Sequence, residues 1–284
     1  MFMMRQVHVD ALIDRYSVIL LDAYGVLVNS EGALPGAASL LTRLNELGKA
    51  FFILTNDATK PPEVAARRYQ GFGLPIEPSH IISSGSLLEA FFREFGLVGK
   101  RCRVLGPPGS LSYVIRAGGR IAEQSEDFEV VVVADQEGFP FLDTIDATLT
   151  GLFARVDAGR AVHLVLPNPD LIYPKPSGYG ITSGSIALLL ESALALRYPG
   201  RPDLRFTALG KPQPALFVEA QRRCGHRDMV MIGDQLATDI TGARAAGIDS
   251  ALLLGGVSGL ASDLPDAMPR PDYVLASLAP RAGG

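Results

Sequence analysis

The chain has 284 residues, of which 48% are hydrophobic and 20% are charged. This composition can fill a sizeable core, so it excludes a mainly disordered chain, and the length indicates one large or two smaller domains. Its 26 Lys+Arg and 30 Asp+Glu give a formal net charge of −4. An acidic chain is a poor match for nucleic acid or an anionic membrane, because both reward a basic face.

The cysteines and the start of the chain indicate where the protein works. Cys102 and Cys224 are the only cysteines, which excludes a disulfide scaffold and a cysteine-rich metal site and is typical of a reducing compartment. Asp10 and Asp14 interrupt the apolar start before it reaches the length of an export signal. No apolar stretch approaches the ~18 residues of a membrane-spanning helix. We therefore expect a cytoplasmic protein.

The first part of the chain alternates apolar runs with amphipathic segments. Residues 17–21 form a continuous apolar run that ends at Asp22, as in a strand buried on both faces. A helix is predicted from Pro35-Gly36 to Gly48, a second strand over 50–54, and a second helix from Pro61-Pro62 to about Gly71. This order favours an α/β sheet with parallel strands.

The rest of the chain continues the same alternation. Further strand-like runs lie at 103–105, 129–133, 162–166, 229–232 and 250–254. Gly and Pro clusters at 71–78 and 198–202 are the best candidate hinges. They would bracket an α/β middle segment, with both ends of the chain combining into one domain.

Polar residues follow three of the predicted strands. Asp22 follows the first, Thr55-Asn56 the second, and Gly233-Asp234 the run at 229–232. The carboxyl ends of parallel strands form one edge of a sheet, where ligands bind, so Asp22 and Asp234 can meet there. Two carboxylates at one edge favour a divalent cation, and hard oxygen ligands favour Mg²⁺.

The same edge would gather groups that bind phosphate. Thr55 adds a hydroxyl, and the turn after it offers backbone N–H groups to an anion. Lys211, in Gly210-Lys211-Pro212, would add a positive charge. Taken singly, each of these residues is ordinary turn chemistry. Together, an aspartate, a metal, a lysine and a hydroxyl indicate phosphoryl transfer through an aspartyl-phosphate.

The order of these motifs resembles the haloacid dehalogenase-like hydrolase superfamily, and within it the NagD/4-nitrophenylphosphatase family with a large α/β cap. The resemblance is carried by segments 21–27 (LDAYGVL), 54–57 (LTND), 210–212 (GKP) and 232–240 (IGDQLATDI), with landmarks at 168–170, 178–184 and 255–258. It implies a doubly wound, Rossmann-like parallel-sheet core from residues 1–79 and 206–284, with an inserted α/β cap over 80–205.

The resemblance also implies roles around the metal. Asp22 would be the nucleophile that attacks phosphorus and a Mg²⁺ ligand. The backbone carbonyl of Tyr24 and the carboxylate of Asp234 would be the other ligands. Asp239 would orient the metal's surroundings without binding it.

Further roles concern the substrate. Thr55 and the N–H of Asn56 would hold the phosphoryl oxygens, and Lys211 would offset charge in the transition state. In the cap, three residues are candidates for facing the substrate by their position in the resemblance, and they can equally be turn residues: Asn168, Asp170 and Tyr179.

Tyr24 departs from the family pattern. The usual motif is Asp-x-Asp-Gly, and its second Asp is the general acid–base, where this chain has Tyr24. A phenol, with a pKa of about 10 in water, is a poor base at neutral pH, and such assistance is typically worth ~10²–10⁴-fold. Three alternatives follow: a slow phosphatase limited to good leaving groups, a phosphatase in which Tyr24 donates the proton, or a protein that binds a phosphorylated ligand without hydrolysing it.

The sequence thus predicts a Mg²⁺-dependent phosphatase acting on a small phosphorylated metabolite. The alternative is a non-hydrolytic phospho-ligand-binding or regulatory protein on the same scaffold. We expect no nucleic acid and no membrane as partners. By analogy, we expect a homodimer formed through the cap.

Overall fold

The structure is a computed structural model that describes residues 5–123, 125–175, 178–255 and 269–281. The family landmark expected at 255–258 lies outside the described residues except for Gly255. The chain divides into two compact units. The core unit comprises Met1–Thr55, Pro62–Ile82 and Lys211–Gly284, and the cap unit comprises Asn56–Pro61 and Ser83–Gly210.

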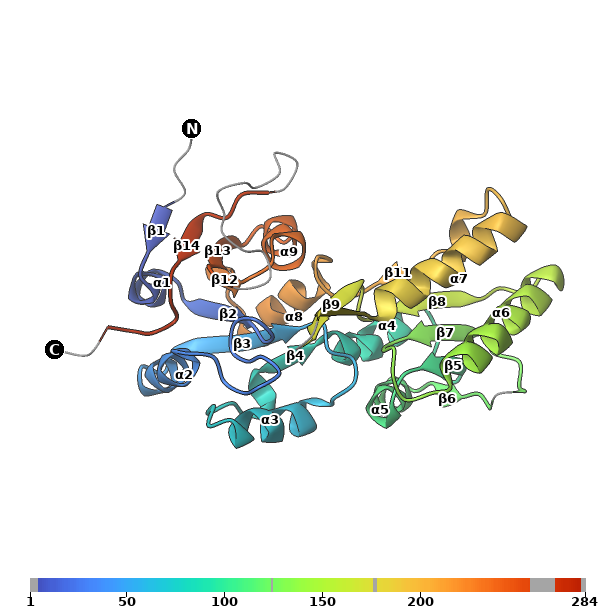
Figure 1. Cartoon of the computed structure of the whole chain (residues 1–284), viewed down its shortest axis with the longest axis horizontal. Coiled ribbons are helices and arrows are strands. Elements are labelled where there is room, and N and C mark those ends of the chain that lie inside the picture. Colours follow the sequence, from blue (N-terminus) through green and yellow to red (C-terminus); the bar gives the residue numbers. More distant parts are fainter. Residues whose placement is uncertain (1–4, 124, 176–177, 256–268, 282–284) are drawn as a thin grey trace. The chain divides into compact units, whose positions relative to one another are not determined.

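The core unit is built on a sheet of seven strands in the order β1-β14-β13-β12-β2-β3-β4. Every neighbouring pair from β1 to β3 runs parallel. Figure 1 shows blue strands from the start of the chain beside red strands from its end. The strand bounds are β1 Arg5–Val7, β2 Val18–Asp22, β3 Ala50–Thr55, β4 Ile81–Ser83, β12 Met229–Gly233, β13 Asp249–Leu253 and β14 Tyr273–Leu275.

The two central strands explain how this sheet forms. Every residue of β2 and of β12 is buried, as expected for apolar runs covered on both faces. The strands pair in register, with Leu21 opposite Ile232 on one side and Ile53 on the other. The polar residues that follow these strands therefore emerge at one edge of the sheet.

Helices cover both faces of the core sheet. Side chains of α1, α2 and α3 pack with Ile19, Leu21 and Ile53 on one face. On the other face, α8 packs on β3 and α9 on β13. The doubly wound arrangement is therefore confirmed. The helix bounds are α1 Val9–Arg15, α2 Ala37–Glu46, α3 Pro62–Gly71, α8 Ala215–Cys224 and α9 Thr241–Ala245, with short turns η1 Pro78–His80 and η4 Leu236–Ile240.

The cap unit contains its own parallel sheet of five strands in the order β11-β8-β7-β5-β6. The strand bounds are β5 Arg101–Leu105, β6 Arg120–Ile121, β7 Val130–Val133, β8 His163–Leu166 and β11 Thr207–Ala208, and a separate antiparallel pair consists of β9 Ile172–Lys175 and β10 Gly178–Ile181. The insertion therefore has the α/β character that the sequence predicts.

Helix pairs also cover the cap sheet. Leu105, Val131 and Val133 pack against α6 and α7. Cys102 lies on the other face, towards α4 and α5. The bounds are α4 Leu88–Glu94, α5 Pro108–Arg116, α6 Phe141–Asp157 and α7 Ser183–Arg197, with turns η2 Ser84–Leu87 and η3 Pro202–Leu204. The boundaries predicted at 79/80 and 205/206 stay predictions. Among the described residues, no helix has the length and apolarity needed to cross a membrane.

Candidate active site

Three carboxylates meet at the carboxyl edge of the core sheet. Asp22 is the last residue of β2, and Asp234 directly follows the neighbouring strand β12. Asp239 lies in the turn η4 that comes next. One carboxylate oxygen from each of the three lies within 4.8 Å of the others, and all three residues are buried. The structure thus brings together the acidic residues that the sequence predicts here.

Lys211 lies between two of these carboxylates. Its Nζ donates to Asp22 Oδ1 at 2.6 Å and to Asp239 Oδ1 at 2.6 Å. A third hydrogen bond, of 3.0 Å, goes to the carbonyl oxygen of Leu54 in β3. The lysine is only 2% exposed, so these contacts replace water around its charge. This edge therefore holds three buried carboxylates and the buried ammonium of Lys211, which bonds to two of them.

The excess of negative charge shifts the acid–base behaviour of the site. Burial raises the pKa of Asp22 well above its usual value, and the charges of Asp239 and Asp234 raise it further, against the opposing effect of Lys211. Burial alone would lower the pKa of Lys211, but the carboxylates of Asp22 and Asp239 outweigh it and raise that pKa. Burial is thus the main cause for Asp22, with the neighbouring carboxylates adding to it, whereas the carboxylates alone raise the pKa of Lys211. A divalent cation would correct this imbalance.

Glycine permits the close approach of the turn after β2 to Asp234. Gly25 has a φ of +96°, and a Cβ built there would collide with the Asp234 carboxylate. Its N–H donates to the carbonyl of Val28 at 2.8 Å, which closes the turn. Gly25 belongs to the motif quoted from the sequence, but its role in the packing of Asp234 was not predicted. The feature of the sequence that could have indicated this close approach is the glycine three residues after the strand-end aspartate.

The turn η4 fixes Asp239. The N–H of Gln235 donates to Asp239 Oδ2 at 3.1 Å, and the N–H of Asp239 donates to the carbonyl of Gln235 at 3.0 Å. At Gly233, a Cβ would collide with the Asp239 side chain. One carboxylate oxygen of Asp239 is thus bound by this backbone, and the other accepts from Lys211.

Three further residues were predicted at this edge: Thr55, Asn56 and Tyr24. Thr55 ends β3, the neighbour of β2, and is 8% exposed. Asn56 is also buried and begins the segment 56–61 that clusters with the cap unit. Tyr24 is half-buried in the turn after β2, where it forms an isolated bridge with Val28. Their roles stay predictions.

The cap candidates separate into two groups. Asp170 and Asn168 lie together, because the N–H of Asp170 donates to Asn168 Oδ1 at 3.0 Å. Asp170 also accepts a hydrogen bond from the side chain of Asn56. Tyr179 is 71% exposed on β10. Of these three, only Asp170 is tied to another predicted site residue outside the cap candidates.

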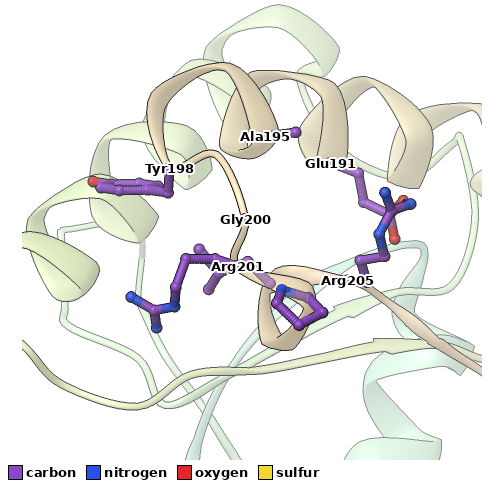
Figure 2. Close-up of a pocket in the computed structure, with 8 residues that line it drawn as sticks. Glu191, Ala195, Tyr198, Gly200, Arg201 and Arg205 are labelled. Atoms are coloured by element: carbon purple, nitrogen blue, oxygen red, sulfur yellow. The ribbon is translucent and has the colours of Figure 1, made fainter.

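A pocket of about 210 Å³ lies elsewhere on the cap unit, between the end of α7 and η3 (Figure 2). Its charged residues are already paired, with Arg201 bound to Asp203 at 2.6 Å and Arg205 lying 3.6 Å from Glu191. The lining, all of it in the described part of the chain, includes none of the predicted site residues: Glu191, Ala195, Tyr198, Gly200, Arg201, Pro202, Leu204 and Arg205. The pocket is therefore separate from the predicted chemistry.

Comparison with known proteins identifies the family. The family model described as haloacid dehalogenase-like hydrolase matches residues 19–120, and the model described as HAD-hydrolase-like matches residues 208–280. Chronophin from Bos taurus is 30% identical over 273 residues, which cover 88% of this chain and 84% of chronophin. The chain belongs to the haloacid dehalogenase-like hydrolases.

Two further similarities support a NagD-like member of this superfamily. Ribonucleotide monophosphatase NagD from Escherichia coli is 26% identical over 92% of this chain and 96% of its own length. The crystal structure of a "possible sugar phosphatase, HAD superfamily" from Cytophaga hutchinsonii is 28% identical, with a TM-score of 0.81 over 98% of this chain and all of that one. The predicted family, fold class and enzyme class, a haloacid dehalogenase-like phosphatase, are therefore confirmed.

Proposed function

We propose that the protein hydrolyses a small phosphorylated metabolite with Mg²⁺ and through an aspartyl-phosphate on Asp22. The observation that carries this proposal is the buried group at the edge of the core sheet, in which Asp22 meets Lys211, Asp234 and Asp239. The similarity to ribonucleotide monophosphatase NagD and to a possible sugar phosphatase supports a phosphatase, and a non-hydrolytic ligand-binding protein is not favoured.

In the first step, a carboxylate oxygen of Asp22 attacks phosphorus while the bond from phosphorus to the leaving-group oxygen breaks. Water then hydrolyses the aspartyl-phosphate and releases inorganic phosphate. Lys211 orients Asp22 through its 2.6 Å contact with Oδ1 and offsets the charge that develops on the phosphoryl oxygens. The hydroxyl of Thr55 and the N–H of Asn56 hold those oxygens.

The donors at this edge fit a magnesium ion. They are hard oxygens, buried, and in excess over the one ammonium present, which is the chemistry that Mg²⁺ prefers. Asp22, Asp234 and the backbone carbonyl of Tyr24 would hold the ion, while Asp239 would hold Lys211. When bound, the ion supplies positive charge that keeps Asp22 ionised and attracts the phosphoryl group.

Tyr24 limits the substrates that turn over quickly. Without a carboxylic acid at this position, the leaving atom, an oxygen or in a phosphoramidate a nitrogen, departs without efficient protonation by the protein. We therefore expect faster reaction with acyl and aryl phosphates, or with phosphoramidates, than with alkyl phosphates. A cytoplasmic location and a homodimer formed through the cap stay predictions from the sequence.

One assay tests this function. Release of inorganic phosphate from 4-nitrophenyl phosphate and acetyl phosphate is measured with Mg²⁺ and with excess chelator. Asp22→Asn removes the nucleophile and is expected to abolish release, whereas Asp14→Asn, at an exposed aspartate of α1, is the matched control and should retain it. Turnover that survives in Asp22→Asn would rule out the aspartyl-phosphate.

A further inference from the structure

The segment 56–61 is attached to the rest of the cap unit, residues 83–210, by buried hydroxyl groups. Ser84 Oγ donates to the carbonyl of Asn56 at 2.7 Å, and Ser110 Oγ donates to that of Ala58 at 2.8 Å. The third bond, of 2.6 Å, runs from the hydroxyl of Tyr113 to the carbonyl of Lys60. The three donors are at most 3% exposed. Alternate carbonyls of the segment are thus bound to the cap unit.

The side chain of Asn56 is confined from two directions. Its Nδ2 donates to Asp170 Oδ1 at 3.0 Å. A carboxylate only accepts hydrogen bonds, so the nitrogen of the amide must face Asp170. The amide oxygen then faces Gly210, where an added Cβ would lie 2.5 Å from Asn56 Oδ1. The side-chain amide of Asn56 therefore has one orientation available, with its nitrogen towards Asp170 and its oxygen towards Gly210.

Asp170 is itself fixed by the loop that follows β8. Its N–H donates to Asn168 Oδ1, and its carbonyl accepts from the N–H of Gly184 at 2.9 Å. The carbonyl of Asn168 accepts from Ser183 Oγ at 2.8 Å. These bonds join the loop, and with it the backbone of Asp170, to the start of α7.

We infer that Asp170 is a positioning residue for phosphate binding, which holds Asn56 so that its backbone N–H faces the phosphoryl oxygens. The inference rests on the proposed function, in which that N–H contacts the phosphoryl group. Asp170 acts here as a hydrogen-bond acceptor and needs no contact with the substrate. It therefore differs from a residue that recognises the leaving group.

The two roles predict different kinetics. A positioning residue supports a contact made to the phosphoryl group of every substrate and of inorganic phosphate. Its loss should weaken binding of all of them by the same factor and change KM more than kcat, because ground state and transition state lose the same contact. If Asp170 instead contacted the leaving group, its loss should change KM only for substrates whose leaving group makes that contact.

The test compares Asp170→Ala, which removes the acceptor, with Asp170→Asn, which keeps an oxygen at Oδ1. Asp157→Ala is the matched control, because the Asp157 carboxylate also accepts side-chain hydrogen bonds on the cap unit. The measurements are KM and kcat for 4-nitrophenyl phosphate and acetyl phosphate, Kd for inorganic phosphate by calorimetry, and backbone hydrogen exchange of segment 56–61. Thermal unfolding checks that each variant folds.

We expect Asp170→Ala to raise both KM values and the Kd about tenfold, with faster exchange in segment 56–61, since a hydrogen bond to a charged group is lost. Asp170→Asn should stay within about twofold of the wild type on every measure, because the acceptor is kept. The control Asp157→Ala should match the wild type in KM, Kd and hydrogen exchange.

Three results would overturn the inference. They are a KM change confined to one substrate with an unchanged Kd, an Asp170→Asn protein as impaired as Asp170→Ala, and faster exchange without weaker phosphate binding. A wild type that neither binds nor releases phosphate would instead refute the proposed function. In that case hydrogen exchange still decides whether Asp170 holds the segment.

Discussion

Tyr24 lies two residues after Asp22, in the turn that glycine at position 25 brings close to Asp234. The residue is half-buried, so its side chain is neither fully inside the core nor free in solvent. If the missing acid limits the rate, a carboxylic acid at this position should restore protonation of the leaving group.

We predict that Tyr24→Asp raises kcat for an alkyl phosphate by about 10²-fold, the lower end of what general acid–base assistance supplies. The gain should be smaller for acetyl phosphate, whose leaving group needs little protonation. Tyr24→Asn is the control of equal size without a transferable proton. Steady-state assays measure kcat for each variant. An equal gain in kcat in both variants, or no gain in Tyr24→Asp, would contradict the prediction.

At the level of elements, one carboxylate joins several parts of the cap unit. Asp127, just before β7, pairs with Arg101 of β5 at 3.1 Å, with Arg155 of α6 at 2.9 Å and with Arg160 at 2.8 Å. Arg155 is 8% exposed, so its guanidinium has little water to replace a lost partner. Although burial opposes it, bonding to Arg155 and the charges of the three arginines hold the pKa of Asp127 below its usual value.

This arrangement predicts a pH-dependent stability of the cap. A carboxylate whose folded pKa is lowered stabilises the fold above its unfolded pKa of about 3.9, and that stabilisation is lost as the pH falls through the lower folded value. Asp127→Asn should therefore lower stability by about 1–2 kcal/mol near neutral pH, and the difference should shrink below about pH 4. Asp203→Asn, which removes a local exposed pair, is the control in denaturant unfolding.

The elements themselves were largely predictable from the sequence. The short apolar runs before Asp22, Thr55 and Asp234 are strands, fully buried in β2 and β12 and mostly buried in β3, and their length and polar ends mark them in the sequence. The edge strand β1 and the attachment of segment 56–61 were not predicted. Both depend on partners far along the chain, such as β14 for β1 and Ser84 for Asn56.

The part of the site that depends on the strands was also predictable, and the part that depends on loop packing was not. Asp22 and Asp234 could be placed at one edge because each lies at the carboxyl end of a parallel strand, and the structure brings them together with Asp239. The pattern contained no signal that Asn56 would bond to Asp170, since a hydrogen bond between two loops depends on how those loops pack.

For the whole molecule, the excess of carboxylates at the core edge predicts stabilisation by a divalent cation. Saturating Mg²⁺ should raise the midpoint of thermal unfolding by several degrees, because an ion that binds only the folded state stabilises it by about 2.7 kcal/mol at a hundred times its Kd. Asp234→Asn should remove most of this shift, and Asp14→Asn should keep it. A Mg²⁺ shift of full size in Asp234→Asn would place the ion elsewhere.

The attachment of segment 56–61 has a consequence for exchanging caps between relatives. A chimera that replaced only residues 83–210 would bring in a foreign cap while keeping the native hexapeptide 56–61, whose carbonyls match Ser84, Ser110 and Tyr113. A transplant that respects the hydrogen bonds has four splice points, at 55/56, 61/62, 82/83 and 210/211. The relative that supplies the cap would then also supply this hexapeptide, and with it part of the loop that we propose binds phosphate.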